Sequence, residues 1–290
     1  GLLVVGAVIL FWAALVERHL YTVRRESLRI LAQGSAEIKV LHISDIHLAP
    51  WQHRRVRFLK SLADLAPDLV VNTGDNLGHR NAIPRLLEAL KPLMVFPGVF
   101  VNGSNDYFGP RPVNPIRYLL RPSEPKHETA LNTNQMTSVF ESAGWVNLNN
   151  QSGELHLAGQ QVQFVGLDDA HINRDIPSSL PKIEASQNLV IGLSHAPYRR
   201  VIDAIGEAGA DLLFCGHTHG GQVCIPGFGA LTTNSDLPAR FAKGLSSWII
   251  SGRVLWLQVS AGIGHSIYAP VRLACRPEVR LLTLLPVDPS

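Results

Sequence analysis

Short apolar runs alternate with amphipathic helical stretches over the first half of the chain. Residues 37–44, 69–72 and 93–102 are rich in valine, isoleucine and leucine, as buried strands are. Between them, residues 59–66 and 83–90 place leucine, isoleucine and alanine at helical spacing. Strands that alternate with helices in this way predict βαβ units and a parallel sheet.

The pattern changes in the second half of the chain. Residues 107–135 carry five prolines and little periodicity, which predicts a long irregular insertion. Regular elements then return. We expect strands in 145–168 and over 189–193, 211–215, 254–259 and 279–285, with a helix around 201–205.

The N-terminal run, residues 1–16, has no charged side chain. We interpret it as a membrane anchor and expect it to continue upstream, because about 17–25 apolar residues are needed to span a bilayer and the chain begins with glycine. The alternatives are the apolar core of a signal peptide and a buried core helix. Residues 17–35 would then be a tether, and 36–290 the globular domain.

Composition narrows the class of protein. The chain has 290 residues, of which 46% are hydrophobic and 17% charged, so it is not intrinsically disordered. A formal net charge of +3 does not argue for nucleic acid. Three cysteines, at 215, 224 and 275, do not make a disulfide framework.

Polar clusters follow five of the predicted strands. Ligands bind at the carboxyl ends of strands in open α/β sheets, so we expect the five clusters to converge on one edge. They are Asp45-Ile46-His47, Gly74-Asp75-Asn76, Gly103-Ser104-Asn105-Asp106, Ser194-His195-Ala196-Pro197 and Gly216-His217-Thr218-His219-Gly220-Gly221-Gln222.

The residue types in these clusters indicate a metal site. Carboxylates, neutral imidazoles and an amide oxygen suit divalent Mn, Fe or Zn. Asp45 and His47 stand two residues apart, as do His217 and His219, so on an extended segment each pair would point the same way. No cysteine pair has ligand spacing, which disfavours a structural zinc site of the Cys type.

The order DxH, GD, GSND, H and GHxH resembles the calcineurin-like metallophosphoesterase superfamily. GHTHGGQ at 216–222 is most similar to its bacterial, membrane-associated YkuE-like branch, which we take to include some hydrolases of UDP-diacylglucosamine. The resemblance implies an α/β four-layer sandwich, two mixed β-sheets flanked by helices. It also implies two divalent metal ions (Mn, Fe or Zn) and hydrolysis by a metal-bridging hydroxide. Asp45, His47 and His219 would hold one ion, Asp75 would bridge both, and His195 and His217 would hold the second.

This sequence departs from the family at Gly103-Ser104-Asn105-Asp106, where the family has an asparagine ligand followed by a catalytic histidine. In strict register, Ser104 takes the ligand position and Asn105 the histidine position. Either Asn105 supplies its amide oxygen after a local shift, or Ser104 lies near the metal as a poor ligand. We favour Asn105, because an amide oxygen is the better neutral donor.

The resemblance also suggests residue roles. Asp75, Asn105 and His217 are the expected catalytic residues, and Asn105, Asp106 and His171 the expected substrate contacts. Without the usual histidine, a leaving group that needs a proton is at a disadvantage. We therefore expect a bias toward good leaving groups, such as one half of a diphosphate or an aryl phosphate. His171 and His127 are possible substitutes, and for each the alternative is an ordinary hydrogen-bonded or surface histidine.

Residues 107–135 carry arginine and lysine side chains among aromatic and leucine residues. Because they follow Asn105 directly, we interpret them as a cap over the metals; the alternative is a solvated loop.

The leading hypothesis for function is a membrane-anchored phosphoesterase with two metals. Its substrate would be a phosphorylated small molecule or a lipid-linked (di)phosphate. The alternative is a catalytically weakened protein that binds metal and a phospho-ligand. Nucleic-acid processing is disfavoured by the small net charge and the apolar N-terminus.

Overall fold

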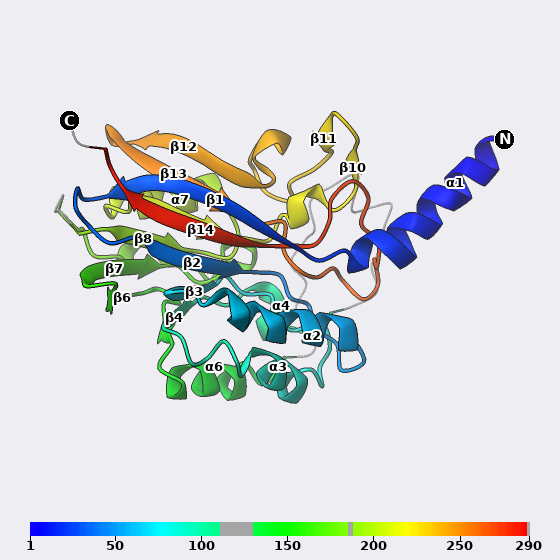
Figure 1. Ribbon diagram of the computed structural model, residues 1–290, viewed down its shortest axis with the longest axis horizontal. Coiled ribbons are helices and arrows are strands. Elements are labelled where there is room, and N and C mark those ends of the chain that lie inside the picture. Colours follow the sequence, from blue (N-terminus) through cyan, green and yellow to red (C-terminus); the bar gives the residue numbers. More distant parts are fainter. Residues whose placement is uncertain (111–129, 185–187, 289–290) are drawn as a thin grey trace.

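Two six-stranded sheets packed face to face form the centre of the molecule (Figure 1). The computed structural model describes residues 1–110, 130–184 and 188–288. The first sheet has the order β1-β14-β2-β3-β4-β5 and the second β12-β13-β9-β8-β7-β6.

The strand bounds of the first sheet are β1 Thr22–Leu31, β14 Glu278–Pro286, β2 Ile38–Ile43, β3 Leu69–Asn72, β4 Gly98–Phe100 and β5 Val146–Asn147. Those of the second are β12 Gly244–Ile250, β13 Arg253–Val259, β9 Leu212–Cys215, β8 Val190–Leu193, β7 Gln160–Gly166 and β6 Gln151–Leu157.

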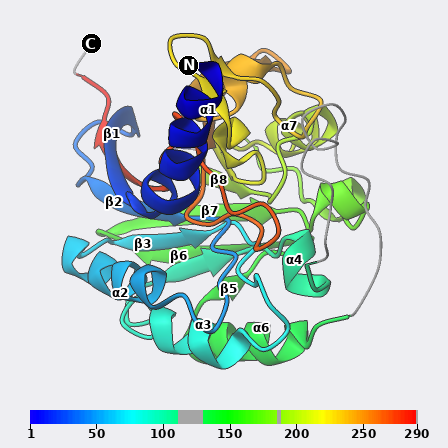
Figure 2. The ribbon, with the colours of Figure 1, turned by 90° about the vertical axis from the view of Figure 1, so that its right-hand side faces the viewer.

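Helices cover the outer faces of both sheets. On the first sheet, α2 (His53–Ser61), α3 (Ile83–Leu90) and α6 (Thr133–Ser142) share one apolar cluster with the strands, while α7 (Arg199–Glu207) packs on the second. The four layers are therefore helix, sheet, sheet and helix (Figures 1 and 2). The predicted four-layer α/β sandwich is confirmed.

The strand β2 shows why the sequence folds into these layers. Val40 packs between the two sheets, and its neighbour Leu41 packs on the opposite face against the helices. Because both faces of the strand are covered, its side chains form a nearly continuous apolar run rather than an alternating one. The same reason explains the runs at β3, β8 and β9, whose residues are all buried.

Parallel strands bring their carboxyl ends to one edge. β2, β3 and β4 run parallel in the first sheet, and β7, β8 and β9 in the second. The loop that follows β3 in the first sheet contacts the loop that follows β8 in the second. His195 Nδ1, just after β8, lies 2.8 Å from the carbonyl oxygen of Thr73, just after β3. The convergence of the polar clusters on one edge is therefore observed.

The N-terminal helix α1 (Leu2–Phe11) projects from the body, and a π-helical turn (Trp12–Val16) and a 3₁₀ turn (Glu17–His19) continue it (Figure 1). Leu3, Val8 and Phe11 are exposed by 91%, 61% and 60%, so this segment is not a buried core helix. Among the described residues, no helix combines the length and the apolar character needed to cross a bilayer.

The expectation of a tether over residues 17–35 is wrong. Residues 22–31 form β1, which pairs in parallel with β14 and adds Leu28 and Leu31 to the core between the sheets. The arginines in this edge strand hid its pattern: Arg24 and Arg25 are both exposed, and Arg24 pairs with Glu278.

The expected insertion is described only at its ends. Phe108 forms an isolated bridge with Ala130, and Thr133 begins α6. Residues 111–129, including His127 and the cations expected to form a cap, lie outside the described residues.

We predict that His42 makes the stability of the fold pH-dependent. Burial lowers its pKa from 6.5 to about 3, with a contribution from Arg280. Below pH 6.5 the His42 side chain therefore binds a proton in the unfolded chain but stays neutral in the folded chain. The free energy of unfolding then drops by about 1.4 kcal/mol for each pH unit. Urea unfolding of the metal-free proteins between pH 7 and 5 measures how steeply the free energy of unfolding falls with pH. His42→Gln should show a slope that is smaller than the wild-type slope by this amount.

The matched control is His156→Gln on the exposed edge of β6, which should keep the wild-type slope. Equal slopes for the wild type and His42→Gln would contradict the prediction.

Candidate metal centre

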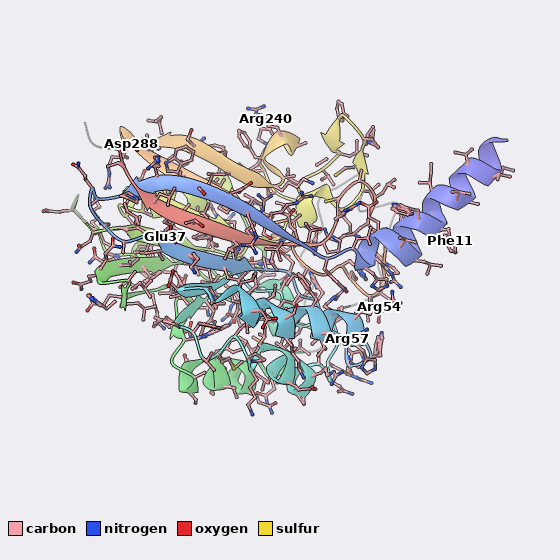
Figure 3. All side chains as sticks on the ribbon, viewed as in Figure 1. Phe11, Glu37, Arg54, Arg57, Arg240 and Asp288 are labelled. Atoms are coloured by element: carbon pink, nitrogen blue, oxygen red, sulfur yellow. The ribbon has the colours of Figure 1, made fainter. Side chains whose placement is uncertain are left out.

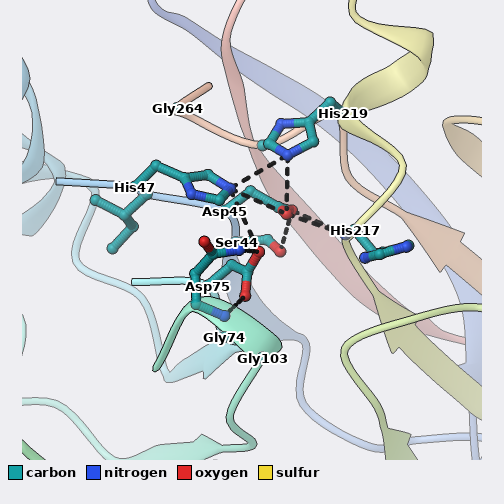
Figure 4. A network of polar contacts seen from close by, with 12 residues as sticks. Ser44, Asp45, His47, Gly74, Asp75, Gly103, His217, His219 and Gly264 are labelled. Carbon is teal, nitrogen blue, oxygen red and sulfur yellow. Dashed lines mark hydrogen bonds and ion pairs between the residues drawn. The ribbon is translucent and has the colours of Figure 1, made fainter. Parts of the chain in front are cut away.

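Asp45, His47 and His219 bring three donor atoms to one point (Figure 4). Asp45 and His47 come from the loop after β2, and His219 from the loop after β9. Nε2 of His47 lies 3.2 Å from Nε2 of His219, and Asp45 Oδ1 lies 3.6 Å from Nε2 of His219. The three side chains are almost completely buried, as the first group of expected ligands requires.

Asp75 lies between this group and a second one. Its Oδ2 is 3.4 Å from His47 Nε2 and 3.5 Å from His195 Nε2. His217 Nδ1 is in turn 3.3 Å from His195 Nε2. A carboxylate that faces histidines of both groups has the position expected for a bridging ligand. Asp45 also reaches the second group, where its donor atom, that of Asp75 and that of His195 all lie within 4.8 Å of one another.

The backbone at these residues is strained rather than extended. Asp45, His47, Asp75, His217 and His219 all have positive φ, between 42° and 68°. The expectation that Asp45/His47 and His217/His219 point alike because they lie on extended segments is therefore wrong. Left-handed conformations of residues with side chains cost free energy, and they gather at functional sites where the surrounding fold enforces them.

Two glycines allow the loops to approach the carboxylates closely. A Cβ on Gly216 would collide with the Ser44 hydroxyl and the Asp45 carboxylate, and one on Gly103 would collide with Asp75. The Ser44 hydroxyl donates a 2.6 Å hydrogen bond to Asp45 Oδ2. Any larger residue at these two positions would push a loop away from a ligand.

Burial prepares most of the histidines for metal binding. It lowers the pKa of His47 to about 4 and holds the pKa of His217 and His219 well below the ordinary value. These imidazoles are therefore neutral near pH 7, and a neutral ring nitrogen is the form that binds a metal.

His195 and Asp75 form a charged pair instead. Burial alone would lower the pKa of His195 and raise that of Asp75, but the attraction between the two outweighs it. The pKa of His195 is well above its usual value and that of Asp75 well below. A cation with the donors of this site would replace the positive charge of His195, so the chemistry of the residues fits a metal.

Asn105 is held against Asp75. Its backbone N–H donates to Asp75 Oδ1 at 2.8 Å, and its side-chain amide donates to Oδ2 at 2.7 Å. The Ser104 hydroxyl is 3.4 Å from the same amide. The structure thus brings Asn105 to the ligand cluster, and its amide lies closer to Asp75 than to the hydroxyl of Ser104.

The structure contradicts the substrate-contact role expected for Asp106. Its side chain is fully buried, and its oxygens accept from the backbone N–H groups of Gly103, Asn76 and Leu77 and from the Asn76 side chain. Burial and the neighbouring Asp75 raise its pKa to about 7. Asp106 therefore fixes the loop that carries Asn105.

His171 lies beside the second group of ligands. The centroid of its ring is 4.6 Å from that of His217, and its Nδ1 is 3.0 Å from the Tyr198 hydroxyl. Burial lowers its pKa to about 4. It is the only one of the two suggested substitute histidines that falls within the described part of the chain.

Comparison with known sequences agrees with this geometry. The family model for calcineurin-like phosphoesterase matches residues 38–221, which span the strands and loops that carry every candidate ligand. The chain belongs to this family. It is accordingly a metal-dependent phosphohydrolase.

Curated relatives align over most of both chains. The phosphodiesterase YaeI of Escherichia coli is 27% identical over 90% of this chain and 87% of its own. The uncharacterised metallophosphoesterase YkuE of Bacillus subtilis is 23% identical over 94% of this chain and 88% of its own. Among solved structures, a dimetal phosphatase from Danio rerio covers 78% of this chain and 88% of its own, with 14% identity and a TM-score of 0.40.

Two buried arginines support the ligand loops of this phosphohydrolase, and the sequence did not reveal them. Arg55 donates to the carbonyl oxygens of Ile46 and His47 at 2.8 and 2.7 Å. Arg272 donates to the carbonyls of Ala261 at 2.7 Å and His219 at 3.4 Å. Arg55 stands in the basic run HRRVRFLK, which reads as a solvated helix face, so no local signal marks it as buried.

We predict that Gly216→Ala weakens metal binding. The added methyl would displace Ser44 and Asp45, so the Mn²⁺ affinity should fall about 10–100-fold and the free energy of unfolding by about 1–3 kcal/mol. Isothermal titration with Mn²⁺ and urea unfolding measure the two effects. Gly6→Ala is the matched control, because nothing lies within 4 Å of a Cβ there. Wild-type affinity in Gly216→Ala would refute this account of the loop.

Proposed function

We propose that the protein is a dinuclear metal-dependent phosphoesterase that hydrolyses a phosphate ester or a diphosphate bond. The observation that carries the proposal is the position of Asp75 between two groups of buried donors, 3.4 Å from His47 and 3.5 Å from His195. A protein that only bound phosphate would have no need for carboxylates at this point, since they repel it.

Each residue has a role in this proposal. Asp45, His47 and His219 would hold one divalent cation, while His195, His217 and the Asn105 amide oxygen would hold the second, with Asp75 shared. Two such cations supply an activated water nucleophile and stabilise the charge on the phosphoryl oxygens. The Asn105 amide would turn its oxygen toward the cation, a rotation that exchanges two atoms of nearly equal size.

Hydrogen bonds beyond the ligands fix the imidazole rings. His195 Nδ1 donates to the Thr73 carbonyl at 2.8 Å, which leaves Nε2 facing the centre. His217 Nε2 is 3.0 Å from the Asn234 carbonyl, which leaves Nδ1 facing the centre. Partners of this kind select the tautomer and orientation that a ligand needs.

The substrate we propose is a phosphorylated small molecule with a good leaving group. The relative YaeI is named a phosphodiesterase, which supports a diester or diphosphate. In strict sequence register Asn105 stands at the position of the family's histidine, and its amide has no titratable proton to give. His171, next to His217, is the described residue best placed to contact the leaving group.

We predict that Asp75→Asn strongly reduces metal-dependent hydrolysis. Loss of the shared carboxylate should lower kcat for bis-p-nitrophenyl phosphate by about 10²–10³-fold and release bound Mn²⁺. The wild type should hydrolyse aryl esters and diphosphates faster than an alkyl phosphate such as glycerol phosphate. Steady-state kinetics and elemental analysis of the same preparations measure both effects.

Asp203→Asn, on the exposed surface of α7, is the control and should behave as the wild type. Bound metal with no turnover of any ester by the wild type would favour the alternative, a weakened protein that binds a phospho-ligand.

We further propose that the protein associates with a membrane through α1. The exposed valine, leucine and phenylalanine side chains of this helix project from the body, and the exposed Arg54 and Arg57 lie on the part of the molecule next to its base (Figure 3). Burial, Arg18 and Arg54 together lower the pKa of His19, which follows the helix, so Arg54 lies near this residue. Apolar side chains flanked by cations are typical of surfaces that bind anionic lipid.

The same end of the molecule holds the metal site. The Arg272 backbone N–H donates to the Ala13 carbonyl at 3.1 Å, and the Arg272 side chain donates to the His219 carbonyl. One residue therefore links the base of the helix to a metal ligand. This closeness supports a lipid-linked (di)phosphate as substrate.

The membrane proposal predicts that charges on α1 prevent binding to lipid. Val5→Asp/Ile9→Asp should reduce co-sedimentation with phosphatidylglycerol vesicles at least about tenfold, a loss of about 1.4 kcal/mol. Val5 and Ile9 are 55% and 44% exposed, so the fold should tolerate the change. Ile249→Asp, at a 67% exposed position of β12, is the control. Equal sedimentation of all three proteins would exclude α1 as the membrane contact.

A further inference from the structure

Two of the three cysteines meet directly behind a metal ligand. Cys224 stands in β10 (Cys224–Ile225) and Cys275 in the segment before β14, and they share one small apolar cluster. Both sulfurs also contact the Gly220 carbonyl oxygen, at 3.2 Å from Cys224 and 3.4 Å from Cys275.

The thiols stabilise the loop that presents His219. Cys275 Sγ donates to the His219 carbonyl at 3.3 Å, and Cys224 Sγ donates to the Gly220 carbonyl. These residues form the 3₁₀ turn His219–Gly221, in which both His219 and Gly220 have positive φ. Positive φ at a residue with a side chain is strained, so this turn depends on the hydrogen bonds that its carbonyl groups accept.

We propose that Cys224 and Cys275 are a modification site: a mild oxidant joins them in a reversible disulfide, and the loss of their S–H donors releases the His219 turn. The inference rests on the proposed metal centre only for its second step, the weakening of metal binding. The first step, formation of the bond, depends on the two thiols alone.

Hydrogen peroxide is an oxidant of the right class and size. One sulfur, as thiolate, attacks a peroxide oxygen, breaks the O–O bond and becomes a sulfenic acid, with release of water. The second sulfur, as thiolate, then attacks the sulfenic sulfur and forms the S–S bond. The sulfenic oxygen leaves as hydroxide and takes up a thiol proton, which gives the second water. Two thiols thereby lose two electrons and two protons, and the peroxide is reduced to two waters.

The surroundings admit this reaction. Lys243 Nζ and Arg272 lie 3.9 Å from Cys275 Sγ, so negative charge that develops on the sulfur is stabilised. Cys224 belongs to a hairpin whose paired strands, β10 and β11 (Gly229–Ala230), have two residues each, and its tip residue Phe228 is 75% exposed. Such a short hairpin opens locally at low cost, which gives a small oxidant access.

Cys275 also connects the turn to the N-terminal helix. Its backbone N–H donates to Glu17 Oε1 at 2.7 Å, and Glu17 Oε2 accepts from the Trp12 indole at 2.9 Å. A movement of Cys275 toward Cys224 therefore acts on the base of the helix as well as on the metal ligand.

Cys215 provides an internal control. It is fully buried in β9, within the separate apolar cluster under α7, and burial raises the pKa of its thiol. We expect it to stay reduced while the other two cysteines are oxidised.

The test treats the full chain with a slight excess of hydrogen peroxide, then unfolds it and alkylates the free thiols. Mass spectrometry should find a peptide cross-linked between Cys224 and Cys275 and an alkylated Cys215. Dithiothreitol should reverse the change. Titration with Mn²⁺ should show an affinity about 10–100-fold lower in the oxidised protein than in the reduced one.

Cys224→Ser and Cys275→Ser each remove the disulfide and should make the Mn²⁺ affinity insensitive to peroxide, while Cys215→Ser should respond as the wild type. Cys224→Ser lies in the short edge hairpin, so it tests the proposal even if Cys275→Ser fails to fold. Three alkylated cysteines after treatment, or a disulfide without any change in Mn²⁺ affinity, would overturn the proposal. Neither readout requires turnover, so an inactive wild type would contradict the proposed function and leave this test intact.

Discussion

The metal centre depends on backbone strain at the ends of buried strands. Five candidate ligands occupy left-handed conformations that residues with side chains avoid. The strain persists because the strands before these loops are locked between two layers, and because glycines at 103 and 216 let the loops touch the carboxylates. The sandwich thus supplies the free energy that holds the ligands in place.

Charge balance is the second requirement of this arrangement. The centre gathers two carboxylates and four histidines that are almost completely buried, and burial keeps three of the rings neutral. Without a metal, the protonated His195 compensates Asp75. The guanidinium groups of Arg55 and Arg272 lie behind the ligands and bind carbonyl oxygens, so they stiffen the loops without occupying the centre.

The loop around residue 272 joins three features that are far apart in the sequence. It contacts the base of the N-terminal helix through Ala13 and Glu17, the metal site through His219, and the thiol pair through Cys275. A disturbance at the apolar helix or at the thiols therefore has a short physical path to a ligand. This connection is what links membrane association, oxidation and metal affinity in our proposals.

The sequence by itself determined the alternation of buried strands and helices in the first half of the chain and the identity of the candidate ligands, because buried strands need apolar runs and metal donors come from few residue types. Two expectations from the sequence were wrong. The arginine-rich segment expected to be a tether is the edge strand β1, and the Asp106 carboxylate accepts hydrogen bonds from backbone N–H groups. Only the tertiary structure decided which way the ligand backbones turn, that Asn105 meets Asp75, and that Arg55, Arg272, Cys224 and Cys275 lie behind the centre. The physical reason is that these features arise from contacts between segments distant in the chain, which leave no local pattern of polar and apolar residues.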